Sequence, residues 1–363
     1  MLPLPGQNRQ VSPFFVFYII YNLQIGVAVL GFERYIAKSA GHDAWISILL
    51  SGASIQIIIW MSYYILNSGK NDIVVIHRQL FGKWLGGLFS LYLIAYIILL
   101  LITNVRTYIE VIQIWIFPHL ATWYMAIILL ALTYMYVSGG FRAVVGICFF
   151  GFFMTIPLLA LKWFPLQEAK PSYLLPVMDH SVFEIYEGAK TMAFSFAGFE
   201  ALLFFYPFIK NAQSSQKWAH FGVLFSTFIY LLSAIVSFLY YSQEQLQRTI
   251  WATLTLWKVV DLPFIERFEY AGIAIWLFVI LPNLCMYTWA ASRGVKQLFS
   301  IKQKDSLIAL LFITLVAVVL ITDRFSIDKL NTLSGNMGII TIYLYIPFIF
   351  IVQLVKNKMR KSL

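Results

Sequence analysis

Two apolar stretches decide the fold: "QIGVAVLGFER" (residues 24–34) and "TMAFSFAGFE" (residues 191–200). Each has the composition of a membrane helix but contains glycine, and the second ends in a carboxylate at Glu200. Glycine is a poor helix former and accepts the backbone angles that an unwound turn needs. A carboxylate within a hydrocarbon layer is costly and is by default functional. Both stretches therefore predict a helix that is interrupted inside a membrane.

The composition of the whole chain is that of a polytopic membrane protein. Of the 363 residues, 61% are hydrophobic, 18% are aromatic and only 12% are charged, which is more apolar surface than a soluble domain can bury. The first apolar run follows Arg9 but is too long for a signal peptide and lacks a small-residue cleavage site, so we expect no cleaved leader. Cys148 and Cys285 lie in apolar runs, where we expect them to pack rather than to form a disulfide or a metal site.

Ten segments have the roughly 20 mostly apolar residues that a spanning helix needs. They are residues 11–32, 43–66, 85–105, 120–138, 143–163, 188–209, 218–240, 268–292, 305–322 and 336–355. The third segment continues towards Phe117, and there Arg106 and Glu110, four residues apart, are expected to form an ion pair near the outer end.

Basic residues are unevenly distributed between the two sides of this topology. With the N-terminus inside, the cytoplasmic segments hold more than half of the 26 lysines and arginines, but only Asp72 and Asp305 among the 16 acidic residues. This positive-inside bias places both termini in the cytoplasm. It also accounts for the net charge of +10, so membrane lipid is expected as a partner and nucleic acid is not.

Ten spans divide into two halves of five, and because five is odd the second half enters the membrane inverted. We therefore expect an all-α integral membrane protein with ten transmembrane helices in a 5+5 inverted repeat, LeuT-like, with broken helices one and six. The chain forms a single polytopic domain, residues 1–363, with repeats at about 11–163 and 188–355. In transporters of this kind the broken helices line a binding site near the middle of the membrane.

Each glycine also has an alternative interpretation as a close-packing residue, which we expect for Gly82, Gly86 and Gly87 at the start of the third span. For the two interruptions, the coincidence of glycines at corresponding positions in both halves favours a broken helix. Freed N–H groups at such a break suit a carboxylate, and freed C=O groups suit an ammonium group or a cation.

The residues at and around the two breaks form a candidate ligand-binding site. Glu200 has three interpretations: it binds the ammonium group of a ligand, carries a proton, or forms a hydrogen bond that locks the sixth span. Tyr96 and Tyr287 fit pocket lining and ordinary packing equally well, and Asn283 shares a helix face with Tyr287. The candidate residues are Gly26, Val27, Ala28, Val29, Leu30, Gly31, Tyr96, Phe196, Ala197, Gly198, Phe199, Glu200, Asn283, Tyr287 and Thr288.

Two longer stretches resemble a known family: "QIGVAVLGFERYIAKSAGHDAWIS" (residues 24–47) and "LLPVMDHSVFEIYEGAKTMAFSFAGFEALLFFYPFIK" (residues 174–210). The first resembles the broken first helix and the Ala-Gly-x-Asp-Ala-Trp turn of the spore germination permease family, the B subunits of Ger-type nutrient receptors within the amino acid–polyamine–organocation superfamily. The second resembles that family's Leu-Leu-Pro-Val outer loop and the Gly-Phe-Glu of its sixth helix. Two positions depart from the family pattern: Ala28 replaces a glycine, and Glu33 replaces a proline and adds an acid near the outer mouth.

The resemblance implies a membrane subunit of a spore germinant receptor, which binds a small nutrient, typically an amino acid, and triggers germination in the inner membrane of the bacterial spore. It implies two partner chains: an A subunit with membrane spans and a soluble domain, and a C subunit that is a lipoprotein. Two alternatives remain, a proton-coupled amino-acid transporter that uses Glu200 and a non-binding scaffold subunit. Thr288 and Ser292 give weak support to sodium coupling, and the fifth span has no lysine at mid-membrane, since Lys162 lies at its end.

No residues in the sequence are spaced as a metal site or arranged as catalytic groups. We therefore expect no cofactor and no enzymatic activity. The histidines lie in loops or at the ends of spans: His42, His77, His119, His180 and His220.

Overall fold

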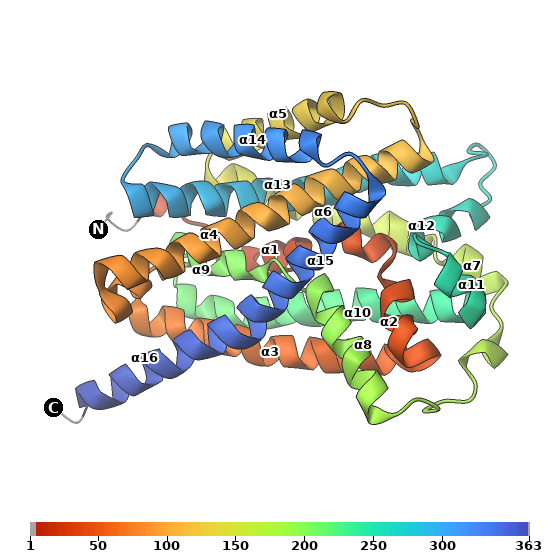
Figure 1. Cartoon of the computed structure of the whole chain (residues 1–363), viewed down its shortest axis with the longest axis horizontal. Coiled ribbons are helices and arrows are strands. Elements are labelled where there is room, and N and C mark those ends of the chain that lie inside the picture. Colours follow the sequence, from red (N-terminus) through yellow and green to blue (C-terminus); the bar gives the residue numbers. More distant parts are fainter. Residues whose placement is uncertain (1–4, 362–363) are drawn as a thin grey trace.

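The computed structural model describes residues 5–361, which form a bundle of helices. Most of the long helices run roughly along the longest axis of the molecule (Figure 1). Both termini lie at one end, called here the terminal end, and α7, α11 and α12 lie at the opposite end, called the loop end. The chain therefore has the shape of a membrane-spanning bundle with long connections gathered at one side.

The helices follow one another with short connections except at the loop end. They are α1 (Phe15–Gln24), α2 (Phe32–Ala40), α3 (Ala44–Gly69), α4 (Ile73–Trp115), α5 (Thr122–Ser138), α6 (Phe141–Ala160), α7 (Trp163–Gln167), α8 (Val182–Ser195), α9 (Leu202–Phe205), α10 (Gln216–Tyr240), α11 (Gln243–Arg248), α12 (Ala252–Leu256), α13 (Phe268–Phe299), α14 (Gln303–Leu320), α15 (Arg324–Ile340) and α16 (Ile346–Lys361). A π-helical segment, Thr341–Tyr345, joins α15 to α16.

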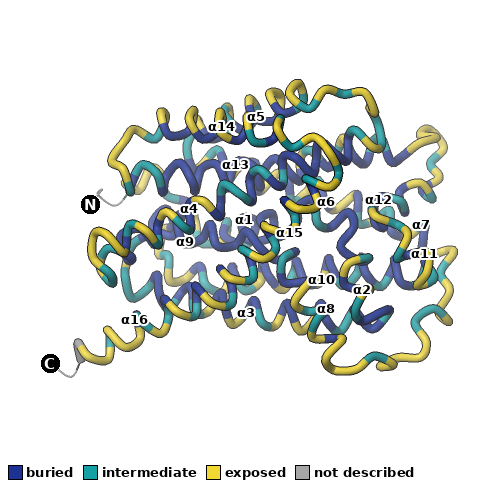
Figure 2. Tube along the Cα trace, in the orientation of Figure 1, coloured by how far each residue is buried: buried dark blue, intermediate teal, exposed yellow. Residues whose placement is uncertain are grey.

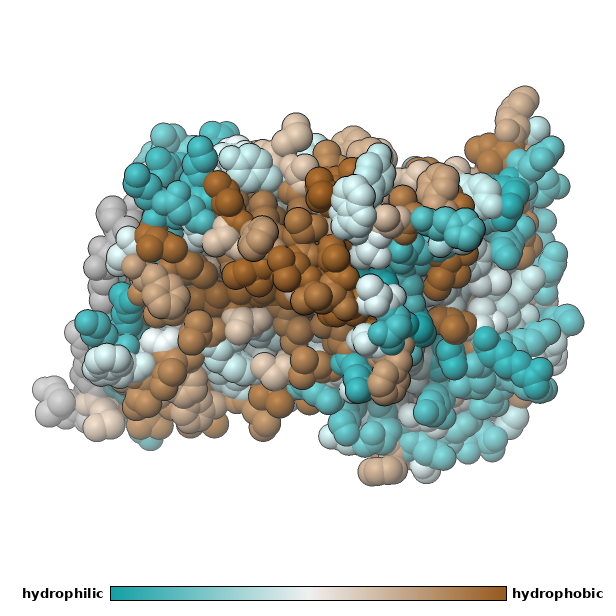
Figure 3. Space-filling model, turned by 45° about the horizontal axis from the view of Figure 1, so that its top comes forward, coloured by the Kyte–Doolittle hydropathy of each residue, from teal (hydrophilic) through white to brown (hydrophobic). Residues whose placement is uncertain are grey.

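The surface and the helix lengths are those of an integral membrane protein. Within residues 5–361, seven helical stretches are long and apolar enough to cross a membrane, or eight if the bent pair Val182–Ser195 and Phe199–Phe208 is one span. The sequence predicts ten crossings; the difference lies in Phe15–Gln24, which is short because the backbone leaves the helix after Gln24, and in Thr122–Ser138. Hydrophobic side chains cover the middle of the visible face, and hydrophilic ones gather towards the loop end (Figure 3).

The core lies where the long helices face one another, and α13 is at its centre. This helix packs against α4, α5, α6 and α14. Buried positions follow the inward sides of the helices, whereas the outward sides of α5, α14 and α16 are exposed (Figure 2). Because lipid is as apolar as the core, this outward exposure of hydrophobic residues is what a membrane protein requires.

A glycine bends α4 near its start. Gly82 has φ +76°, so the helical backbone is broken there, and a Cβ at Gly86 would meet the carbonyl oxygen of His77 at 2.5 Å. Gly86 is thus the close-packing residue that the sequence predicts, and Gly87 is in ordinary contact, with Leu298 3.8 Å from its would-be Cβ. The packing prediction is wrong for Gly82: no described atom lies within 4 Å of a Cβ there, and its positive φ is what requires glycine.

The expected ion pair between Arg106 and Glu110 does not form. The Arg106 guanidinium donates to the carbonyl oxygens of Ile321 (2.5 Å) and Thr322 (3.0 Å), and Glu110 accepts from Arg324 at 2.6 Å. Arg106 therefore binds the segment that joins α14 to α15, and Glu110 binds the first residue of α15. The sequence prediction failed because it considered only neighbours on the same helix.

Candidate functional site

The first interruption lies between α1 and α2. The backbone leaves the helix at Ile25 (φ −99°, ψ 96°), forms a 3-10 turn at Val27–Leu30 and resumes as α2 at Phe32. Two side chains of a single other helix, α13, donate to the freed carbonyl groups. Asn283 donates to the Ile25 carbonyl oxygen (3.1 Å), and Tyr287 donates to that of Leu23 (3.2 Å).

The second interruption follows α8. Gly198 has φ +112°, a left-handed conformation that favours glycine, and the segment Phe199–Phe208 leaves α8 at an angle of 49°. A Cβ at Gly198 would overlap the Tyr287 hydroxyl and would lie 2.7 Å from the Leu23 carbonyl oxygen. Gly198 is therefore required both by its φ and by the close approach of the two interruptions.

Tyr230 of α10 connects the two interruptions directly. Its hydroxyl lies 2.7 Å from the carbonyl oxygen of Gln24 and 2.9 Å from that of Ser195, which are the last residues of α1 and α8. The ring is fully buried and packs edge-on against Phe32 and Phe196. Sequence reasoning missed this residue, because an aromatic residue in an apolar span carries no signal of the carbonyl groups that it meets.

Glu200 is hydrogen-bonded within the protein. One carboxylate oxygen accepts from the backbone N–H of Gly198 (2.6 Å) and the other from the Tyr96 hydroxyl of α4 (3.0 Å). The side chain is fully buried. The carboxylate thus accepts a hydrogen bond from the freed N–H of the second interruption and connects this interruption to α4.

A cavity of about 900 Å³ extends from the two interruptions to the loop end. Residues of α4 and α13 line its inner part, and Trp251, beside α12, and Arg324, on α15, line the part towards the loop end. The volume lies within the range of about 300–1,000 Å³ that is usual for small-molecule sites.

The cavity wall contains about half of the candidate residues from the sequence. Those in the wall are Gly26, Val27, Ala28, Gly31, Ala197, Asn283 and Tyr287. The other candidates are buried behind the wall: Val29, Leu30, Tyr96, Phe196, Gly198, Phe199, Glu200 and Thr288. Glu33, expected near the outer mouth, is also fully buried and outside the wall, since its side chain faces α10 and α12.

Two buried carboxamides give the inner wall its chemistry. Gln24 is only 1% exposed, and neither its Oε1 nor its Nε2 has a hydrogen-bond partner among the described residues. Asn283 uses its Nδ2 but leaves its Oδ1 unpaired in the same way. Unpaired polar atoms in a buried position are costly unless a ligand or water satisfies them. Gln24 was missed as a site residue although it opens the quoted stretch.

Charged side chains surround the mouth of the cavity. Arg34 and Lys38 of α2 line it without an ion pair among the described residues, whereas Lys190 pairs with Glu187 (3.5 Å). On the opposite side, Arg324 is held by Glu110 and by Asp328, which lies 2.8 Å from it. The mouth therefore carries unpaired positive charge, which favours the entry of ligands with a carboxylate or another anionic group.

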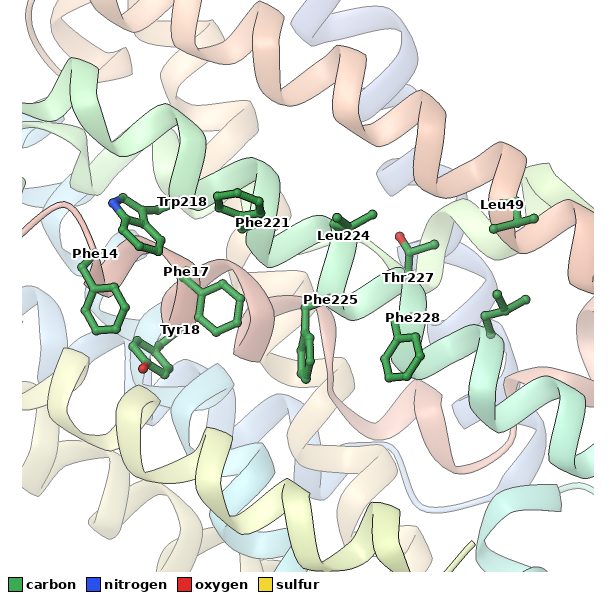
Figure 4. A pocket seen from close by; sticks show the side chains of 11 residues that line it. Phe14, Phe17, Tyr18, Leu49, Trp218, Phe221, Leu224, Phe225, Thr227 and Phe228 are labelled. Carbon is green, nitrogen blue, oxygen red and sulfur yellow. The ribbon is translucent and has the colours of Figure 1, made fainter. Parts of the chain in front are cut away.

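A second hollow, of about 630 Å³, lies on the flank of the molecule between α1 and α10. Aromatic rings from both helices face it, among them Phe17, Trp218 and Phe225 (Figure 4). Among the lining residues, only Tyr18, Thr227 and Trp218 carry a polar side-chain group, two hydroxyls and one indole N–H. It is thus suited to apolar chains such as those of lipids, and the cavity at the interruptions is the better site for a polar ligand.

An all-helical membrane protein with a cavity between two interrupted helices has the architecture of a membrane transporter. Two solved structures share this fold: MhsT in complex with L-phenylalanine (TM-score 0.66, 12% identity, 96% of this chain and 99% of that chain) and a Na+-coupled sialic acid symporter in a substrate-bound outward-open state (TM-score 0.65, 10% identity, 93% and 80%). The family model described as "Spore germination protein" matches residues 10–327. The spore germination protein GerQB of Bacillus cereus is 44% identical over 352 residues, which cover 97% of this chain and 98% of that protein. The chain therefore belongs to the spore germination protein family of membrane permeases.

Proposed function

We propose that this chain is the membrane subunit of a germinant receptor and binds a small polar nutrient in the cavity at the two interruptions. The observation that carries the proposal is the set of buried polar atoms in the inner wall that have no partner among the described residues: both polar atoms of the Gln24 carboxamide and the Oδ1 of Asn283. The Gln24 Nε2 offers a donor to a carboxylate, and the two amide oxygens offer acceptors to an ammonium group. An amino acid has both groups, and it is the nutrient class that we propose.

The proposal includes the finer topology. We infer ten crossings, in which α1 with α2 and α8 with α9 are the broken first and sixth spans of an inverted repeat. The positive-inside bias supports a cytoplasmic location for both termini. The cavity then faces the outside of the spore's inner membrane. By analogy with the name of GerQB, the chain acts as a B subunit beside an A subunit and a lipid-anchored C subunit.

In this proposal Glu200 positions the site rather than contacting the ligand. Its two oxygens already accept hydrogen bonds from Gly198 and Tyr96, and it lies behind the cavity wall. The ammonium group of a ligand would meet the oxygens of Gln24 and Asn283 instead. A proton-carrying Glu200 belongs to the alternative of proton-coupled transport, which the likeness to transporter structures favours.

The test is equilibrium binding of radiolabelled amino acids to the purified protein, followed by uptake into liposomes. Binding without uptake is expected for a receptor. Binding with uptake would establish the transporter alternative. If the protein neither binds nor takes up an amino acid, the scaffold alternative would hold. The variant Gln24→Leu should lose at least about tenfold in affinity with little change in thermal stability, because the Gln24 carboxamide has no hydrogen-bond partner to lose among the described residues.

Asn22→Leu is the matched control for this variant. The Asn22 side chain is equally buried but donates to the carbonyl oxygens of Tyr18 and Cys148, both at 2.7 Å, outside the cavity wall. It should lower thermal stability and leave the affinity of the folded protein unchanged. Equal ligand affinity in Gln24→Leu and the unmodified protein would reject the proposed site.

A further inference from the structure

A short segment at the loop end covers part of the cavity. This cap segment, residues 243–256, contains α11 and α12, and Gln247, Ile250 and Trp251 contribute to the cavity wall. Both of its helices pack against α2, the half-helix that follows the first interruption. Movement of α2 would therefore be transmitted to the cap segment, and movement of the cap segment would be transmitted to α2.

The absence of a side chain at Gly31 lets the cap segment come close to the interruption. A Cβ at Gly31 would overlap the carbonyl oxygen of Ile250 and would lie 3.2 Å from the Cα of Trp251. Since φ of Gly31 is −163°, close approach rather than backbone strain is the reason for glycine here. The cap segment thus rests on the last residue before α2.

Glu33, two residues further on, joins the cap segment to the rest of the bundle. Its Oε1 accepts hydrogen bonds from the Ser237 hydroxyl of α10 (3.1 Å) and from the Thr253 hydroxyl of α12. The carboxylate is fully buried, and its Oε2 has no hydrogen-bond partner among the described residues. One carboxylate therefore links α2, α10 and the cap segment.

Burial of the Glu33 carboxylate costs free energy, so a contribution to stability alone does not explain its position. Lys162, 8% exposed, is close enough to interact electrostatically, but it forms no ion pair with Glu33 within 4 Å in the described part of the chain. A buried charge without a contacting counter-charge is often less stabilising than apolar packing of the same volume. The hydrogen bonds of Glu33 instead fix the position of one particular segment, the one that closes the cavity.

We propose that Glu33 is a positioning residue that fastens the cap segment to α2 and so limits access to the cavity from the loop end. The inference rests on the proposed function in one respect: the gated cavity is the nutrient site. Loosening the contact between Glu33 and Thr253 should open the cavity more often, admit solutes faster and release a bound nutrient faster.

The test measures access to the cavity without any nutrient. A cysteine placed at Asn104, which lines the cavity beside Gly26, is modified with a membrane-impermeant maleimide, and the reaction rate is measured in the full-length protein. The natural Cys148 and Cys285 are buried and give a low background. A second cysteine at the exposed Lys170 reports reagent reactivity outside the cavity.

The decisive comparison is a matched pair at Thr253. Thr253→Val keeps the shape but removes the hydroxyl, and it should raise the labelling rate at residue 104 by about tenfold, as expected for loss of a hydrogen bond to a charged group. Thr253→Ser keeps the hydroxyl and should label at the parental rate. Glu33→Ala should also raise the labelling rate, and the double variant should add little to Glu33→Ala alone, because both changes remove the hydrogen bond between Glu33 and Thr253. Labelling at residue 170 should stay constant throughout.

Equal labelling rates at residue 104 in Thr253→Val and Thr253→Ser would overturn the proposal. A structural role for Glu33 would instead lower protein yield in Glu33→Ala without separating the two Thr253 variants. The result is independent of the nutrient assay: a parental protein that binds no nutrient rejects the proposed function, whereas a normal affinity with unchanged labelling rejects only the role of Glu33.

Discussion

At the scale of single residues, the two interruptions are held by hydrogen bonds from side chains rather than by flexibility. Glu200 binds the freed N–H of Gly198, and Tyr230 lies within hydrogen-bond distance of the last carbonyl groups of α1 and α8. Backbone at membrane depth can leave a helix only where such partners replace the lost helical bonds. The chemistry of the cavity therefore depends on residues that stand behind its wall.

At Gly198 even the smallest side chain should destabilise the protein. A Cβ there would overlap the Tyr287 hydroxyl, and φ of +112° is strained for any other residue, so Gly198→Ala should cost about 1–3 kcal/mol in stability. Gly335→Ala is the control, because the nearest atom to a Cβ there is 3.6 Å away in the Phe194 ring. Thermal unfolding in detergent would measure both variants. Equal midpoints would show that the second interruption relaxes easily.

Glu200→Gln separates a positioning role from direct binding. Gly198 and Tyr96 donate to different oxygens of Glu200, and glutamine replaces one of these oxygens by an NH₂ group and removes the charge, so stability should fall by about 1–3 kcal/mol. Nutrient affinity of the folded protein should change less than tenfold, because the carboxylate lies outside the cavity wall. Tyr96→Phe removes the same bond from the other side and should not add fully to Glu200→Gln. A hundredfold loss of affinity at unchanged stability would make Glu200 a ligand contact.

At the scale of elements, the helices themselves were largely readable from the sequence, whereas their contacts were not. The expected span 120–138 corresponds to α5 and the span 218–240 to α10, because long apolar runs identify helices well. Periodicity does not say which side of a buried helix meets a cavity, since every side is apolar. Phe196 and Ala197 are neighbours in the sequence, yet only Ala197 reaches the wall.

The two stretches that resemble the family most are joined to each other, a contact that neither stretch reveals alone. Asp43, at the corner between α2 and α3, accepts hydrogen bonds from the backbone N–H groups of Met178 (2.8 Å), Asp179 (2.8 Å) and His180 (3.2 Å). The His180 ring adds a fourth contact at 3.1 Å. Asp43 thereby fixes the loop from which α8 begins, and α8 leads to the second interruption.

Asp43→Ala should consequently release this loop. The three N–H groups would lose a charged acceptor, and we expect a loss of at least about 3 kcal/mol in stability together with faster proteolysis within residues 168–181. Glu184→Ala, at the exposed capping box of α8, is the milder comparison and should cost about 1 kcal/mol. If both variants were cleaved at the same rate, the loop would be held by other contacts.

At the scale of the whole molecule, the helices, the cavity and the charges point to one orientation. Both termini lie at the terminal end, opposite α11 and α12 (Figure 1). The cavity wall includes Gln247 of α11 and Trp251 beside α12, so the cavity reaches the loop end. The receptor proposed above needs its cavity on the outside of the membrane, which is the orientation that the positive-inside bias of the sequence predicts. Under the proposal, Arg34 and Lys38, which have no ion pair among the described residues, would face the incoming nutrient at the mouth.

This orientation is tested by labelling single cysteines from each side of the membrane. Glu244→Cys, in the cap segment, should react with an impermeant maleimide only from outside, and Lys304→Cys, at the start of α14, only from the cytoplasmic face. Both positions are exposed, and the natural cysteines are buried, so the signal reports the side and not local burial. Residue 304 lies in the most basic of the connections expected on the cytoplasmic side, residues 293–304, whose translocation the positive-inside rule opposes. This connection holds Arg293, Lys296, Lys302 and Lys304. Reversed labelling of the pair would turn the cavity towards the cytoplasm. A nutrient outside the membrane could then no longer reach Gln24 and Asn283, and the receptor function proposed for this chain would fall with the topology.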